Sequence, residues 1–206
     1  MENFFDSAAQ DWDKNQLHIK RSEAIAKELR EIIVFQENSK ALEYGAGTGL
    51  LSFAIKDLFS EITLMDSSLE MVRVTTEKLE KEDIQNLFPV FFDLEKENYE
   101  LKSFDFIFTQ MTLHHVSNIH EIFSKFYKLL NKGGQIAIVD LYKEDGTFHD
   151  RDFTGHSGFN PEDLEVILSK IGFVDINFKQ CFEITKVDGP DKGKVYPLFL
   201  LSCNKL

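Results

Sequence analysis

An acidic residue followed by three alternating glycines is the segment of this sequence with the clearest chemical meaning. It reads Glu43-Tyr44-Gly45-Ala46-Gly47-Thr48-Gly49 and stands between an apolar run and a stretch with helical periodicity. Glycines at this spacing let the backbone turn tightly and approach a ligand closely, and the amides that begin a helix can face that ligand. We therefore predict a cofactor-binding loop that joins a strand to a helix.

The spacing of the glycines argues against a dinucleotide as the ligand. A dinucleotide fingerprint, G-x-G-x-x-G, counted from Gly45 needs a glycine at position 50, where the chain has Leu50. Glu43, two residues before the first glycine, would repel a pyrophosphate but attract a cationic ammonium group. An NAD-dependent oxidoreductase is therefore the weaker alternative.

Further polar residues stand where predicted strands end. Asp66 closes the second strand, where a carboxylate can accept hydrogen bonds from both hydroxyls of a ribose, in an NAD-type cofactor as well as in other nucleosides. Gln110 follows the fourth strand and can bond the amino-acid end of a cofactor or stay solvated. In open α/β sheets the ligand crevice lies at the carboxyl ends of the strands, so these residues are candidates for one site.

His114 and His115 follow the same fourth strand and are the candidate catalytic residues. A histidine with a pKa near neutrality suits proton removal from an acceptor, whereas the alternative is a histidine bonded to backbone at the entrance of the next helix. Neighbouring side chains do not easily face one ligand, so we expect at most one of the two to act. We predict no metal site, because no further Cys or His falls at ligand spacing near the pair.

The elements that must position these residues follow from the hydrophobic pattern. Short apolar runs alternate with stretches of helical periodicity, which is typical of βαβ units and predicts an α/β fold with a parallel sheet. The predicted strands are Lys40–Tyr44, Glu61–Met65, Leu87–Phe92, Phe104–Thr109 and Gln135–Leu141. The predicted helices are Ile19–Phe35, Gly49–Phe59, Ser68–Glu82 and Asn118–Asn131.

After residue 141 the rhythm of the sequence changes. A long loop, 142–160, carries His149 and His156 and opens at the sheet edge where a substrate wall can form. A helix is predicted from Pro161 to near Gly172, with proline at its first position. Two apolar runs, Val174–Thr185 and Val195–Ser202, flank a segment rich in turn residues and predict an antiparallel hairpin at the edge of the sheet.

In this order, the motifs resemble the class I S-adenosylmethionine-dependent methyltransferase family, small-molecule type. The E-x-G-x-G-x-G loop at 43–49 is similar to the family loop that wraps the methionine part of the cofactor. Segment 104–116 resembles the family's fourth motif, and 129–140 resembles its helix, glycine turn and fifth strand. The resemblance runs from about residue 38 to 203, and segment 8–13 resembles the part of small-molecule methyltransferases that folds over the cofactor.

The resemblance implies a Rossmann-like, doubly wound seven-stranded sheet, mostly parallel, with a C-terminal antiparallel hairpin. It implies one methyltransferase domain over residues 1–206, made of a helical lid at 1–35 and a core at 38–206. The cofactor would be S-adenosyl-L-methionine. Its expected contacts are Trp12, Glu43, Gly45, Ala46, Gly47, Thr48, Gly49, Asp66, Ser67, Asp93, Leu94, Thr109 and Gln110. Asp93 would end the third strand and meet the adenine amino group, with Leu94 against the ring.

The composition of the chain limits the classes of partner that it can bind. The chain has 206 residues, with 23 basic against 35 acidic side chains and a net charge of −12. This charge disfavours nucleic acids and anionic membrane surfaces. No apolar run approaches the roughly 18 residues of a membrane span, and a secretory leader is not visible, so we expect a cytoplasmic protein. The sequence does not determine an oligomeric state.

The fourth motif also narrows the acceptor. It reads Thr109-Gln110-Met111-Thr112 and lacks both the D/N-P-P-Y/F pattern of adenine and glutamine methyltransferases and a nearby cysteine of the cytosine-5 type. We therefore expect methyl transfer to an oxygen, nitrogen or carbon atom of a small molecule. A catalytically silent S-adenosylmethionine-binding module is the alternative, because it would keep the same loop and acids.

Overall fold

The computed structural model describes residues 4–33, 38–100, 103–149 and 152–206, and it contains one seven-stranded sheet. The strand order is β3-β2-β1-β4-β5-β7-β6. Five strands are mutually parallel, and β7 runs antiparallel to both β5 and β6. The strands are β1 (Lys40–Tyr44), β2 (Glu61–Asp66), β3 (Leu87–Phe91), β4 (Phe104–Gln110), β5 (Leu130–Leu141), β6 (Phe173–Thr185) and β7 (Val195–Lys205). The predicted fold class is confirmed.

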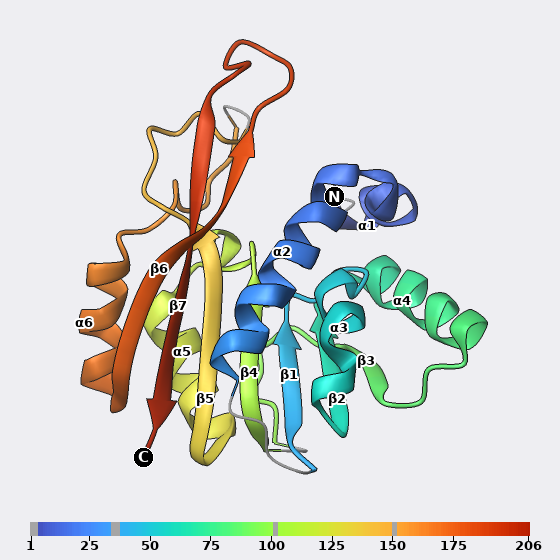
Figure 1. Ribbon diagram of the computed structural model, residues 1–206, viewed down its shortest axis with the longest axis vertical. Helices are drawn as coiled ribbons and strands as arrows, with labels where there is room; N and C mark the ends of the chain where they lie inside the picture. The colour runs from blue at the N-terminus through green and yellow to red at the C-terminus, as the bar shows by residue number, and fades with distance from the viewer. Residues whose placement is uncertain (1–3, 34–37, 101–102, 150–151) are drawn as a thin grey trace.

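Helices cover both faces of this sheet (Figure 1). They are α1 (Phe4–Ala8), α2 (Gln16–Ile32), α3 (Leu50–Ile55), α4 (Leu69–Glu82), α5 (Ile119–Leu129) and α6 (Pro161–Ile171), with short 3-10 helices η1 (Ala9–Lys14), η2 (Lys56–Leu58) and η3 (Leu113–His115). Among the described residues, no helix is long and apolar enough to cross a bilayer.

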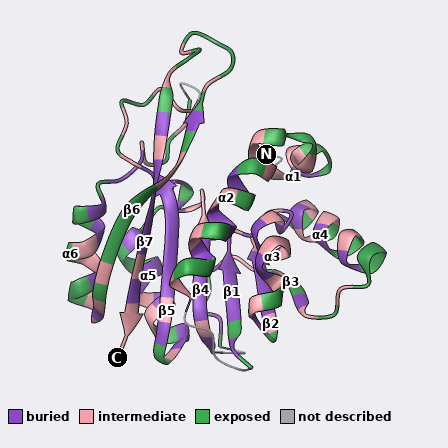
Figure 2. Cartoon of the chain, in the orientation of Figure 1, coloured by how far each residue is buried: buried purple, intermediate pink, exposed green. Residues whose placement is uncertain are grey.

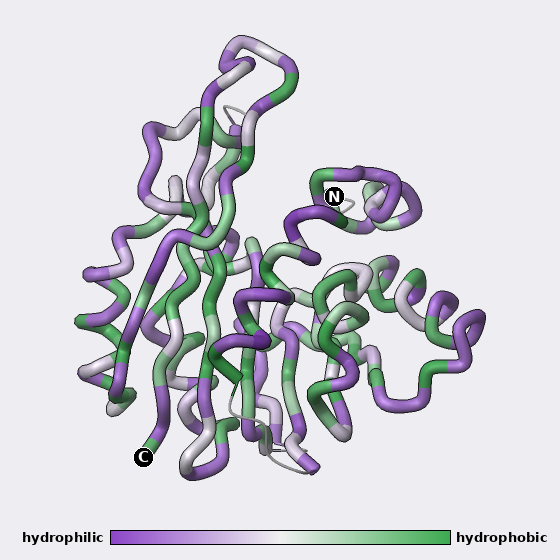
Figure 3. The backbone as a smooth tube through the Cα atoms, viewed as in Figure 1, coloured by the Kyte–Doolittle hydropathy of each residue, from purple (hydrophilic) through white to green (hydrophobic). Residues whose placement is uncertain are grey.

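Side chains that alternate along the central strands form two cores, one on each face. Ile107 and Ile136 pack against α5 and α6, whereas Phe108 and Ala137 pack with α2 and α3 on the other side. Figure 2 shows the central strands as mostly buried, and Figure 3 shows apolar residues concentrated along them. A parallel sheet covered on both faces leaves its carboxyl edge as the place for a ligand.

Several element boundaries differ from the sequence prediction: β5 begins at Leu130 instead of Gln135, and α3 ends at Ile55 instead of Phe59. Helix α2 begins at Gln16 instead of Ile19, because the Asn15 side chain caps it by accepting from the amide of Leu17 at 2.9 Å. It ends at Ile32, and the predicted end at Phe35 lies outside the described residues. Strand β3 ends at Phe91, two residues before Asp93, where it was expected to end with that acid.

Candidate active site

The glycine loop joins β1 to α3 at the carboxyl edge, as predicted. Gly45, Gly47 and Gly49 have φ angles of 68°, 56° and 79°, in the left-handed region that side chains rarely adopt. The amides of Gly45 and Ala46 donate to the carbonyl of Met65 at 2.9 and 3.0 Å, so the loop is fixed to the end of β2. A Cβ at Gly45 would stand 2.2 Å from the Thr112 side chain. Glycine is therefore required there by both backbone and packing.

Glu43 lies at the end of β1 and faces the first turn of α3. It is 2% exposed, and its Oε2 accepts from the amide of Ser52 at 3.2 Å and from the Ser52 hydroxyl. Burial raises the pKa of Glu43 to about 8. The nearby charge of Asp66 raises that pKa further, because two carboxylates repel each other.

Asp66 lies at the end of β2 and supports the loop directly. Its Oδ2 accepts from the amide of Gly47 at 2.7 Å, and its Oδ1 accepts from the amide of Ser68 at 2.8 Å. Burial raises the pKa of Asp66. Ser67, its neighbour, is exposed at the same edge. Glu43 and the half-buried Asp66 lie beside one glycine loop, and a cation bound there would favour the charged form of both carboxyl groups.

The N-terminal segment, residues 4–14, lies over the glycine loop (Figure 1). Asp13 accepts from the Thr48 hydroxyl and pairs with Lys78 at 2.7 Å, while Lys78 also donates to the Thr48 carbonyl at 2.7 Å. The indole Nε1 of Trp12 lies 3.9 Å from the point where a Cβ of Gly47 would be. These contacts place the region expected to form a lid against the predicted cofactor loop.

Three predicted cofactor contacts have structural roles in this conformation. Leu94 is 1% exposed and belongs to the core, and Asp93 turns the chain by accepting from the amides of Glu95 and Lys96. Thr109 is buried, and its hydroxyl donates to the carbonyl of Tyr44 at 2.8 Å, which ties β4 to β1. Leu94 and Thr109 are thus placed inside the fold, and Asp93 stays at its carboxyl edge.

Gln110 meets helix α2 near a buried arginine that the sequence did not single out. The Gln110 amide donates to the Ser22 hydroxyl at 2.9 Å. Arg21, which precedes Ser22 in α2, is 7% exposed, and its Nε has no hydrogen-bond partner among the described residues. Burial lowers the pKa of Arg21 to about 10, and the charge of Asp140 opposes that shift. A buried guanidinium with an open donor is suited to an anionic group of a ligand.

His114 and His115 occupy η3, directly after β4. His114 is 1% exposed, and its Nδ1 lies 2.7 Å from Oδ1 of Asp140 at the end of β5. His115 packs edge-on against Phe5 and Phe153, with ring centroids 5.1 and 5.2 Å away. Burial lowers the pKa of His115 to about 3, and the nearby His114 lowers it further.

The two histidine rings lie together, although neighbouring side chains do not easily face one ligand. Their ring centroids are 4.2 Å apart, because the tight turn of η3 places both rings on one side. The sequence places no further Cys or His at ligand spacing near the pair, but the fold brings His149 from the loop after β5 to both rings, at centroid distances of 4.9 and 5.5 Å. That neighbour is 34 positions from His115, so local spacing carried no signal of it.

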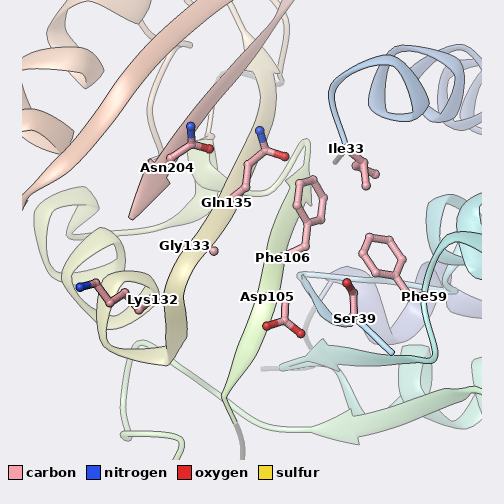
Figure 4. Close-up of a pocket in the computed structure, with 10 residues that line it drawn as sticks. Ile33, Ser39, Phe59, Asp105, Phe106, Lys132, Gly133, Gln135 and Asn204 are labelled. Carbon is pink, nitrogen blue, oxygen red and sulfur yellow. The ribbon is translucent and has the colours of Figure 1, made fainter. Parts of the chain in front are cut away.

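A cavity of about 360 Å³ opens beside these histidines. Its lining includes His115 and Ser117 after β4, and Phe153 and His156 from the loop 142–160. This volume lies within the range of small-molecule sites. Another cavity, near Asp105 and Lys132 at the amino ends of the strands (Figure 4), holds only about 110 Å³ and lies at the opposite edge of the sheet.

The loop 142–160 is closed at its base. Tyr142 and Phe159 form an isolated bridge, and the amide of Lys143 donates to the carbonyl of Phe159 at 2.8 Å. The amide of His156 donates to the carbonyl of His114 at 2.7 Å, which holds the loop against η3. The wall predicted for the substrate is therefore fixed at its base and against η3.

Comparison with known proteins agrees with this geometry. Residues 17–177 match a family model described as a methyltransferase domain. The chain belongs to the class I S-adenosylmethionine-dependent methyltransferases. Members of this family use S-adenosyl-L-methionine as methyl donor. The loop fits a cationic donor of this kind, because the carboxyl groups of Glu43 and Asp66 lie beside it and a cation there would favour their charged forms.

Individual methyltransferases resemble parts or all of this chain. Malonyl-[acyl-carrier protein] O-methyltransferase 1 of Ilyobacter polytropus is 40% identical over 98 residues, 47% of this chain and 35% of the relative. A SAM-dependent methyltransferase of Aquifex aeolicus superposes with a TM-score of 0.69 at 19% identity, covering 99% of this chain and 100% of that one. Phosphoethanolamine N-methyltransferase 2 of Haemonchus contortus, solved with S-adenosylhomocysteine, superposes with a TM-score of 0.70 at 18% identity. The match covers 89% of this chain and 52% of that one. The chain spans half or less of the curated relatives it matches.

Proposed function

We propose that this methyltransferase transfers the methyl group of S-adenosyl-L-methionine to an oxygen, nitrogen or carbon atom of a small molecule. The observation that carries the proposal is the cavity of about 360 Å³ beside the histidines. A line of aromatic rings connects it to the glycine loop: His115 contacts Phe5, Phe5 contacts Trp12 at 6.0 Å, and Trp12 lies over Gly47. Donor and acceptor regions thus adjoin at one edge of the sheet.

The residues of the chain act on this reaction mainly by positioning. The sulfonium group of the donor supplies an activated methyl group, so the protein must align the acceptor and keep water out. We assign the ribose hydroxyls to Asp66 and the amino-acid end of the donor to Glu43 and Gln110. Trp12 and the rest of the N-terminal segment act as the lid over the donor, and Asp93 with Leu94 mark the adenine side.

The acceptor class is supported by the cavity and by the relatives. The Ilyobacter enzyme is named for transfer to an oxygen atom and the Haemonchus enzyme for transfer to a nitrogen atom. His115 is the member of the pair that lines the cavity, and we assign it to contact with the acceptor. Its pKa of about 3 makes it a weak proton acceptor, so we assign it a positioning role. We propose the cytoplasm as its location, which cell fractionation tests.

Calorimetry followed by a product assay tests this proposal. Purified protein is titrated with S-adenosylhomocysteine, with NADH as control, and then incubated with S-adenosyl-L-methionine and a panel of carboxylic acids, phenols and amines. Binding of S-adenosylhomocysteine alone, together with a methylated product, is the expected result. Tight binding without product across the panel would favour a silent binding module, and binding of NADH would overturn the assignment of the cofactor.

A further inference from the structure

Three imidazoles from two segments of the chain converge beside the cavity. His114 and His115 come from η3, and His149 comes from the loop after β5. One ring nitrogen from each lies within 4.8 Å of the other two. Imidazole nitrogens are donors of the kind that transition metals prefer.

His114 is oriented by a second, independent feature of the fold. Its Nδ1 is engaged by Asp140 at 2.7 Å, which leaves Nε2 as the ring nitrogen available to another partner. Asp140 is itself fully buried and accepts from the amides of Leu141 at 2.7 Å and His114 at 3.3 Å. A carboxylate behind a histidine is the usual arrangement that holds a metal-ligating imidazole in place.

We propose that His114, His115 and His149 bind one divalent transition metal ion of the zinc type. Three imidazoles form the protein part of such a site, and a fourth position is left for water or a substrate atom. His115 lines the cavity of about 360 Å³, so the open position is accessible from there. The site is distinct from the glycine loop and from Asp66.

Metal binding requires a small closure of the three rings. Ligand nitrogens about 2.0 to 2.1 Å from a tetrahedral zinc ion stand about 3.4 Å from one another, closer than the 4.8 Å limit of this group. His149 sits on a loop, whereas His114 is held by Asp140, so rotation of the loop histidine accounts for most of the movement. The competing interpretation is an aromatic wall, since His149 stacks on Phe153 with ring centroids 3.8 Å apart. That wall would bind no metal.

The role of the ion in catalysis rests on the proposed function, methyl transfer to a small molecule. An acceptor hydroxyl, thiol or amine that occupies the fourth position loses its proton more easily, because the ion stabilises the electron pair left behind. That pair then forms the new bond to the methyl carbon as the carbon–sulfur bond breaks, and the pair of the broken bond stays on sulfur as S-adenosylhomocysteine forms. The acceptor proton passes to solvent, so charge and atoms balance.

Metal titration of the protein tests the site without relying on catalysis. Chelator-treated protein is titrated with Zn²⁺ by calorimetry and with Co²⁺ by visible absorption. We expect one ion per chain and the intense visible bands of a tetrahedral Co²⁺ complex. His149→Ala should weaken binding at least 10-fold, and Asp140→Asn about 10- to 100-fold through loss of orientation. His120→Ala, on the exposed side of α5, serves as the matched control and should bind like the wild type.

Binding of S-adenosylhomocysteine by each variant separates the possible failures. A His149→Ala protein that keeps its affinity for S-adenosylhomocysteine is folded, so its loss of metal then reports on the site. Absence of stoichiometric metal binding in the wild type, or equal binding by the His149→Ala and His120→Ala proteins, would overturn the metal site and leave the proposed function standing. Metal binding without any binding of S-adenosylhomocysteine would support the site and contradict the proposed function.

Discussion

Asp66 combines two roles at a single carboxylate. It accepts from the amides of Gly47 and Ser68, and it is also the side chain assigned to the ribose of the donor. We expect Asp66→Ala to weaken binding of S-adenosylhomocysteine by about 1.5 to 3 kcal/mol, the scale of hydrogen bonds to charged groups, or roughly 10- to 150-fold in Kd. Calorimetric titration measures this loss.

A second aspartate provides the control for that experiment. Asp57 pairs with Arg30 on the surface, away from the glycine loop, so Asp57→Ala should bind S-adenosylhomocysteine like the wild type. Circular dichroism and thermal unfolding show whether Asp66→Ala is folded. An unchanged Kd in a folded Asp66→Ala protein contradicts the ribose assignment.

Glu43 predicts a pH dependence of stability in the ligand-free protein. Its pKa is raised from 4.5 to about 8 by burial, so the folded protein keeps a proton that the unfolded chain releases. Stability is therefore greatest below pH 4.5 for this group, and it falls as the pH rises towards 8, by up to about 1.4 kcal/mol per pH unit.

Glu43→Gln should remove this part of the pH dependence, because glutamine does not titrate and its carbonyl still accepts from the amide of Ser52. Urea unfolding at about pH 5 and about pH 8 gives the two free energies of unfolding for each protein. The stability of wild type relative to the variant should fall with pH. Parallel profiles for the two proteins would show that Glu43 does not carry a raised pKa.

The sequence predicts single residues well where a local motif defines them. The glycine spacing located Glu43 and the loop, and the ends of strands located Asp66. It could not pair Asp140 with His114, or His149 with the two neighbouring histidines, because these partners lie 26 or more positions apart and meet only through the sheet and the long loop. The burial of Leu94 was not predictable for a related reason: it depends on helix α5 and on strands that its neighbours in the sequence do not reveal.

At the scale of elements, the N-terminal segment makes its position measurable through Trp12, the one tryptophan of the chain. Its indole lies over Gly47 and beside His18, with ring centroids 4.3 Å apart. We expect titration with S-adenosylhomocysteine to change tryptophan emission, and Trp12→Ala to weaken binding by about 0.5 to 1.5 kcal/mol, the scale of an aromatic contact.

Trp12→Phe separates the signal from the binding. That protein should keep most of its affinity in calorimetry while the tryptophan emission is lost. Emission that stays constant in the wild type while calorimetry shows saturation would place the segment away from the donor.

A side chain at Gly45, in the turn between β1 and α3, would destabilise the protein in two ways: through backbone strain and through a clash with Thr112. The two contributions can be measured separately. Both Gly45 and Gly133 have positive φ, but a Cβ at Gly45 would meet Thr112 whereas a Cβ at Gly133 meets nothing within 4 Å. Gly133→Ala should lose about 1 to 2 kcal/mol from backbone strain alone, and Gly45→Ala more. Chemical unfolding gives both values, and equal losses would show that Thr112 moves aside freely.

The predicted elements agree with the structure where helix signals and buried strands are strong, and differ at their ends. Asn15 begins α2 three residues before the expected start, because its cap outweighs the hydrophobic periodicity on which the prediction rested. Strand β3 stops early because Asp93 accepts from backbone amides and turns the chain. Such polar side-chain bonds fix boundaries that periodicity leaves open.

At the scale of the whole molecule, the net charge of −12 makes a prediction about partners. Nucleic acids should not bind, because affinity for a phosphate backbone depends on cationic side chains. Fluorescence anisotropy with labelled duplex DNA and transfer RNA, at about 0.05 M salt where such binding is strongest, should show no saturable change. Saturable binding that weakens with salt would reveal a local basic surface and contradict this expectation.

The strands that make up the sheet could be predicted from the sequence, whereas their order in the sheet could not. A hairpin after α6 was expected, yet either of its strands could pair with β5. The structure selects β7, whose residues 198–201 form a continuous buried run, whereas β6 is largely exposed and lies at the edge. A continuous apolar run requires cover on both faces, which agrees with the inner place of β7.

The closed base of the loop 142–160 has a consequence for how this protein can change over evolution. The bridge between Tyr142 and Phe159 brings the two ends of the loop together, so exposed side chains between them can be exchanged without moving β5 or α6. The glycine loop, to which we assign the donor, is encoded about a hundred positions earlier and shares no residue with this segment. Acceptor preference can therefore change through substitutions in one segment, without any change in the loop assigned to the donor.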